Sequence, residues 1–203
     1  MIRSKMSDKA FIIIGFVVIG IIFLLYSRIN DFSITTDSIQ SIERLATGFY
    51  IILFMSFGII GYGIYRYHQR KVVENSHRLL SIIAKTIIDN RSKKIFIVTF
   101  IVYGMFFSLT SGLIVYQPDV IFSHDYDVIV PSVHMNACCG EPGYMPTIIM
   151  YITEHVGLQI IPINLLLVVI VSYLVGLNTA LAVRAISITK KSGGLTGIGA
   201  TTG

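Results

Sequence analysis

Hydrophobic positions along the chain gather into four long blocks that polar segments separate. A helix that crosses the hydrocarbon core of a bilayer needs about 20 mostly apolar residues, and inside lipid its backbone groups must pair within the segment. The pattern therefore predicts an all-α polytopic membrane protein, a single membrane domain over residues 1–203. Its four predicted transmembrane helices cover residues 10–27, 45–65, 95–117 and 160–184.

The segments between these spans have patterns of their own. In the inner loop, residues 66–94, apolar side chains recur at helical spacing at Leu79, Ile82, Ile83 and Ile87. This spacing predicts a basic amphipathic helix at the inner membrane surface. An outer loop is expected over residues 117–146. Residues 147–157 follow Pro146 and are expected to form a short surface helix, because proline suits a first helical turn.

The composition supports a bilayer protein. Hydrophobic residues make up 54% of the chain and charged residues 13%, whereas an ordinary soluble domain carries about 25% charged residues. The mean hydropathy is +0.75.

Basic residues indicate how the spans are oriented. If both termini lie inside, 14 of the 16 Lys and Arg also lie inside, and none occurs between Lys94 and Arg184. This is the charge asymmetry expected of cytoplasmic loops. The net charge of +5 is thus a membrane pattern, and a nucleic-acid partner is not expected. These patterns predict a multi-pass protein of the plasma membrane whose partners are the lipid bilayer and other membrane subunits.

The stretch "VPSVHMNACCGEPGYMP", residues 130–146, carries the chain's two cysteines and is expected on the outer face. Thiolate, thioether and imidazole groups suit copper, although no zinc-type spacing is present. Cys138 and Cys139 also fit a disulfide between neighbours, free thiols or bonds to another chain. If the outer groups bind metal, the candidate ligands are His124, His134, Met135, Cys138, Cys139 and His155.

Two spans carry small residues at four-residue intervals, which let helix backbones approach closely in lipid. The candidate packing residues are Gly104, Ser108 and Gly112 in the third span and Ser172, Gly176 and Ala180 in the fourth. The fourth span also contains Asn164 and Asn178. Polar residues within a span face protein or water, so a structural hydrogen bond and a transport role both remain open for each.

The segments "ACCGEPGYMP", "YITEHVGLQIIPINLLLVVIVSYLVGLNTALAV" and "GGLTGIGATTG" resemble multi-pass membrane proteins of ammonia-oxidising archaea and their relatives. The resemblance covers about residues 130–203 and rests on the Cys-Cys-Gly turn and the "IPIN" and "GLN" motifs. It implies a copper-rich setting, because ammonia oxidation in such cells is a membrane copper process. It implies no particular activity.

These observations favour a non-catalytic accessory or structural subunit of a membrane complex, with copper association implied by the resemblance. A transporter or copper-handling protein and a membrane thiol redox protein are the alternatives. An enzyme is less expected, since the sequence has no nucleophile turn, usefully spaced paired acids or nucleotide-binding motif.

Overall fold

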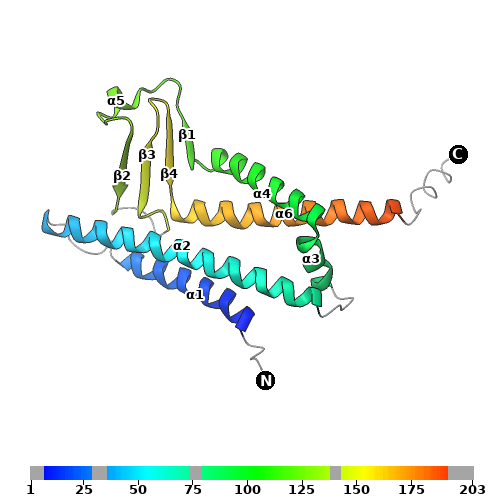
Figure 1. Cartoon of the computed structure of the whole chain (residues 1–203). Coiled ribbons are helices and arrows are strands. Elements are labelled where there is room, and N and C mark those ends of the chain that lie inside the picture. Colours follow the sequence, from blue (N-terminus) through cyan, green and yellow to red (C-terminus); the bar gives the residue numbers. More distant parts are fainter. Residues whose placement is uncertain (1–6, 29–35, 74–78, 138–142, 192–203) are drawn as a thin grey trace. The chain divides into compact units, whose positions relative to one another are not determined.

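The structure is a computed structural model that describes residues 7–28, 36–73, 79–137 and 143–191. The chain divides into two compact units, one of Met1–Tyr65 with Phe106–Val168 and one of Arg66–Met105 with Val169–Gly203. The elements, in chain order, are α1 (Ser7–Ser27), α2 (Thr36–Val73), α3 (Leu79–Ile88), α4 (Asn90–Thr110), β1 (Ile114–Tyr116), α5 (Phe122–Asp125), β2 (Ser132–Asn136), β3 (Thr147–Tyr151), β4 (Val156–Ile160) and α6 (Pro162–Lys191) (Figure 1).

Four of these helices are long and apolar enough to cross a membrane, as the sequence predicts. Their candidate spans are Lys9–Ser27, Ser41–Val72, Asn90–Thr110 and Pro162–Thr189. The third helix ends earlier than expected, at Thr110 rather than at residue 117. Gly112 follows with a φ of +76°, the left-handed conformation common just beyond helix ends.

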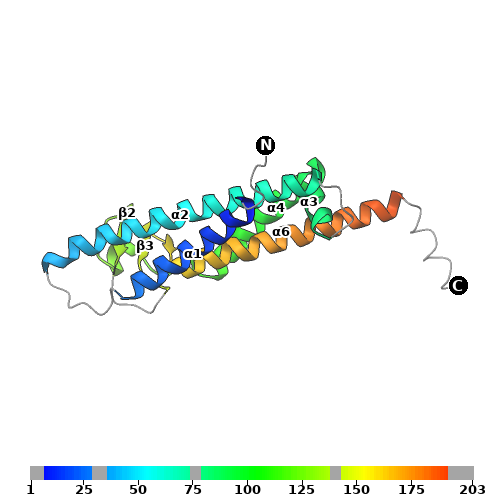
Figure 2. The ribbon, with the colours of Figure 1, turned by 90° about the horizontal axis from the view of Figure 1, so that it is seen from below.

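In the first unit, α1 and α2 lie side by side (Figures 1 and 2). Glycines allow this close approach, because a Cβ on Gly63 would lie 3.0 Å from the Ile12 side chain and one on Gly15 would collide with Ile60. A buried cluster fills the interface and includes Phe49, whose ring centroid lies 5.3 Å from that of Tyr26. Close packing of this kind, rather than water exclusion, stabilises helix pairs in lipid.

The same unit contains a four-stranded antiparallel sheet in the order β1-β4-β3-β2. The all-α prediction is therefore wrong in this part, and so is the surface helix over residues 147–157. Thr147–Tyr151 and Val156–Ile160 instead form the hairpin β3–β4. Each strand is only five residues long, and periodicity cannot separate so short an apolar run from a helical turn.

Two tyrosines connect the sheet to the α1–α2 pair. The Tyr50 hydroxyl lies 2.6 Å from the carbonyl oxygen of Pro146 and 2.7 Å from that of Ile160. The Tyr26 hydroxyl donates to the carbonyl oxygen of Ala137. These bonds fix the ends of β2, β3 and β4 on the aromatic end of the buried cluster.

The second unit contains α3 and most of α4 and α6. The predicted amphipathic helix is present as α3, but it buries Ser81, Ala84 and Thr86 and exposes Ile82. The small, polar side of α3 therefore faces protein. The guanidinium of Arg184 donates to Thr86 Oγ1 at 2.9 Å and so connects α6 with α3.

Asp89 begins α4. Its carboxylate accepts hydrogen bonds from the backbone N–H of Ser92 at 3.2 Å and from the hydroxyl of the same residue at 3.1 Å. This is N-capping of the first helical turn, and these bonds lower the pKa of Asp89 below its usual value of 3.8.

Candidate functional site

The sheet has two chemically different faces, because side chains alternate along each strand. The registers place nine apolar side chains on one face, called the apolar face here: Ile114, Tyr116, Val133, Met135, Ile148, Met150, Val156, Leu158 and Ile160. The opposite face, called the mixed face, carries Val115, Ser132, His134, Asn136, Thr147, Ile149, Tyr151, Gly157 and Gln159.

Only part of the apolar face is covered within its unit. Met135, Ile148 and Ile160 pack against the buried α1–α2 cluster. In contrast, Tyr116 is 64% exposed and Val133 is 65% exposed. Contiguous exposed apolar patches often mark interaction sites.

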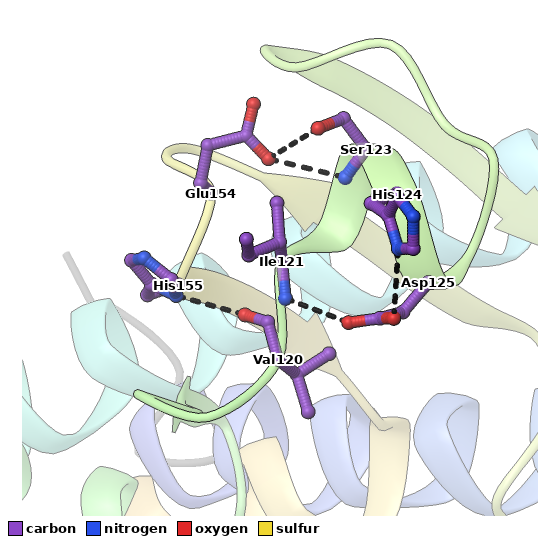
Figure 3. Close-up of polar contacts among 7 residues, drawn as sticks. All are labelled: Val120, Ile121, Ser123, His124, Asp125, Glu154 and His155. Atoms are coloured by element: carbon purple, nitrogen blue, oxygen red, sulfur yellow. Dashed lines mark hydrogen bonds and ion pairs between the residues drawn. The ribbon is translucent and has the colours of Figure 1, made fainter.

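On the mixed face, a short loop with α5 is held against the β3–β4 turn by Glu154 (Figure 3). The Glu154 carboxylate accepts the hydroxyl of Ser123 at 2.8 Å and its backbone N–H at 3.1 Å. The backbone carbonyl of Glu154 accepts the N–H of Phe122 at 3.0 Å. The Ser123 hydroxyl and then its N–H lower the pKa of Glu154 below its usual value of 4.5.

His155 and Asp125 complete this network (Figure 3). His155 Nδ1 lies 2.8 Å from the carbonyl oxygen of Val120, and since a carbonyl only accepts, this nitrogen carries the proton. The Asp125 carboxylate accepts the N–H of Ile121 at 2.8 Å and lies 3.2 Å from His124 Nδ1. The Ile121 N–H and then His124 lower the pKa of Asp125.

Beside this network, the mixed face carries a half-open hollow of about 140 Å³. Its lining includes Gln117, Phe122, Tyr126, Tyr151 and Gln159. Phe122 is buried, and its ring lies over Gly157, where a Cβ would be 3.6 Å from the ring. Because Gly157 has no side chain, the Phe122 ring can pack directly on the sheet at this position.

The predicted metal ligands lie in different environments. His134 Nε2 is 3.0 Å from the hydroxyl of Ser132 on the mixed face, whereas the neighbouring Met135 is on the apolar face. His124 is on α5 and exposed, and His155 is bonded to backbone carbonyls.

Among the described residues, no group of three or more His, Cys, Asp or Glu side chains could hold a metal ion. Cys138 and Cys139 lie outside the described residues, so copper binding and the disulfide stay predictions.

The small-residue stripes meet within the chain. A Cβ on Gly104 would lie 3.3 Å from Ser172 Oγ, and one on Gly176 would lie 3.1 Å from the carbonyl oxygen of Phe96. Ala180 is fully buried as well. Gly112 does not belong to the packing stripe, because a Cβ there would meet nothing within 4 Å. Ser108 accepts through its carbonyl oxygen from the Ser111 hydroxyl at 3.4 Å.

The two span asparagines differ. Asn164 Nδ2 donates to the carbonyl oxygen of Ser111 at 2.9 Å, just beyond the last turn of α4, so its side chain has a structural partner. Asn178 is exposed on α6. Asn164 therefore does not need a role in transport to explain why a polar residue lies in this helix.

Sequence reasoning missed Phe122, Tyr151 and Gln159. The one available signal was the alternation of "TIIMY" and "VGLQI", which puts Ile149 and Tyr151 on one side of a strand and Gln159 across from them.

The described part of the chain thus combines four helices that are long and apolar enough to cross a membrane with a small sheet formed from the segments between α4 and α6. Comparisons with family models, curated proteins and solved structures find no match. The resemblance to proteins of ammonia-oxidising archaea therefore stays a prediction.

Proposed function

We propose that the protein is a non-catalytic subunit of a membrane complex and that the exposed part of its apolar sheet face contacts a second membrane subunit. The observation that carries this proposal is the exposure of Tyr116 and Val133, on the edge strands β1 and β2, on a face whose row of Met135, Ile148 and Ile160 is packed. Ile152, which directly follows β3, is 52% exposed as well. The plasma membrane, with the sheet on its outer side, is the location that the distribution of Lys and Arg supports.

Charge favours a protein partner over the lipid surface. Between Lys94 and Arg184 the chain has no Lys or Arg, but it has Asp119, Asp125 and Asp127 as well as two glutamates. Segments that bind anionic lipid headgroups carry the opposite charge. We therefore infer a partner whose outer surface has an apolar patch with Lys or Arg around it.

The polar network also supports a binding role. The hydroxyl of Ser123 donates to the Glu154 carboxylate, and His155 Nδ1 donates to the carbonyl oxygen of Val120. The backbone carbonyl of Glu154 accepts the N–H of Phe122. These contacts hold the loop and α5 on the sheet, which is a structural use of the groups that enzymes most often employ in catalysis.

The test compares two neighbouring residues of β2. Val133→Glu places a charge on the apolar face, and His134→Glu places the same charge on the mixed face. The protein is purified from native membranes in mild detergent, and its partners are identified by mass spectrometry. We expect the wild type and His134→Glu to retain a stoichiometric membrane subunit that Val133→Glu loses.

A photoactivatable amino acid at position 133 then identifies the contact. We expect it to crosslink to a segment of the partner that carries Lys or Arg. A protein that purifies alone, or a partner that both variants retain, would contradict the proposal. Metal analysis of the same samples tests the copper association that the resemblance implies.

A further inference from the structure

The hollow on the mixed face has the size of a small-molecule site. Its volume is about 140 Å³, close to the roughly 150 Å³ of an apolar cavity that holds benzene. It opens to the surface of the sheet module formed by β1–β4 and α5. The exposed apolar residues of the proposed partner contact lie on the other face of the sheet.

Aromatic rings form one wall of the hollow. The Tyr151 ring centroid lies 5.0 Å from that of Phe122 and 6.4 Å from that of Tyr126. Phe122 and Tyr126 are stacked, with centroids 5.8 Å apart. The faces of such rings carry partial negative charge and attract cations.

Two side-chain amides add polar groups. Gln117 and Gln159 line the hollow, and in the part of the chain that the structure describes neither amide group has a hydrogen-bond partner. An amide oxygen accepts a hydrogen bond from an N–H or O–H of a ligand. The hollow thus combines an aromatic wall with acceptors that are not used by the fold.

The negative charge of this part of the chain favours a positively charged ligand. The chain has no Lys or Arg from residue 95 to residue 183. Asp125 on α5 and Glu154 in the β3–β4 turn add carboxylates that are ionised at neutral pH. The summed negative potential of such a surface concentrates cations.

We propose that the hollow binds a small organic ammonium ion. Tyr151 and Tyr126 contact the cationic group through their ring faces, and the side-chain oxygen of Gln159 accepts a hydrogen bond from the ligand. The site does not depend on the partner subunit, since it uses the other face of the sheet.

The experiment measures binding of choline to the full-length protein in dodecyl maltoside, a detergent without a choline group. The matched probe is 3,3-dimethyl-1-butanol, which has the shape of choline but no charge. Saturation-transfer NMR titrations give both dissociation constants. We expect choline to bind about tenfold more tightly, which corresponds to about 1.4 kcal/mol and lies within the range of cation–π contacts. Equal affinities, tighter binding of the neutral probe, or no binding of choline would overturn the proposal.

Variants locate the site. Tyr151→Leu removes one aromatic wall, and we expect it to weaken choline binding about tenfold, whereas Tyr151→Phe retains the ring and the affinity. Tyr116→Leu is the control, because Tyr116 is an exposed tyrosine on the apolar face. If Tyr151→Leu does not fold, Tyr126→Leu takes its place, since Tyr126 is 51% exposed at the edge of the hollow. Choline binding at wild-type strength in the folded variant that lacks its ring would overturn the assignment.

Discussion

Tyr50 on α2 donates its hydroxyl hydrogen to the carbonyl oxygen of Pro146, at the start of the β3–β4 hairpin, over an oxygen–oxygen distance of 2.6 Å. The same hydroxyl lies 2.7 Å from the carbonyl oxygen of Ile160, at the end of the hairpin. One side chain on a membrane helix therefore holds both ends of a hairpin. Tyr50 is 4% exposed, so water does not reach these carbonyls easily.

Replacing Tyr50 with Phe should destabilise the protein by about 1–3 kcal/mol, because buried carbonyls lose their donor. SDS titration followed by circular dichroism measures the free energy of unfolding. Tyr116→Phe is the matched control and should change it by less than about 0.5 kcal/mol, since that tyrosine is 64% exposed. Equal effects of the two substitutions would show that the Tyr50 hydroxyl does not anchor the hairpin.

Acid should release α5 from the β3–β4 turn. Hydrogen bonds from Ser123 lower the pKa of Glu154 in the folded protein. Their stabilising effect is therefore complete above the unfolded value of 4.5 and is lost as the pH falls through the lower folded pKa. We expect the amide of Ser123 to lose protection against hydrogen exchange, relative to the intrinsic rate, over this acid range. Glu154→Gln should already be less protected at neutral pH and should respond less to acid. A wild-type protection factor that is constant through the range would refute this role of Glu154.

The contact between Gly104 and Ser172 should not tolerate a larger side chain. A Cβ on Gly104 would already lie 3.3 Å from Ser172 Oγ, and overpacking of this kind costs about 1–3 kcal/mol. Gly104→Leu should therefore lower the free energy of unfolding by that amount. Gly20→Leu is the control in α1, where a Cβ would meet nothing within 4 Å. If both variants unfold alike, the close approach at Gly104 is not a stabilising contact.

The four long helices could be predicted from the sequence, whereas the sheet could not, and the reason is physical. An uncharged run such as residues 10–27 is long enough to have one interpretation. Thr147–Tyr151 is too short to distinguish strand from helix, and its pairing depends on β2 and β4 rather than on its own residues. The hollow is harder still to predict from the sequence, because it depends on the packing of Phe122 against Gly157, which is distant in the chain. The early end of α4 had a visible signal in Gly112, since glycine commonly follows a helix.

The two asparagines of α6 should behave differently on substitution. Asn164 Nδ2 donates to the carbonyl oxygen of Ser111 at 2.9 Å, so Asn164→Leu leaves that acceptor without its donor and should cost about 1 kcal/mol. Asn178 is exposed, and Asn178→Leu should change the free energy of unfolding by less than about 0.5 kcal/mol. The free energy of unfolding by SDS titration distinguishes the two variants. A neutral Asn164→Leu would mean that this bond does not stabilise the fold, and it would make Asn164 available again for a role in transport.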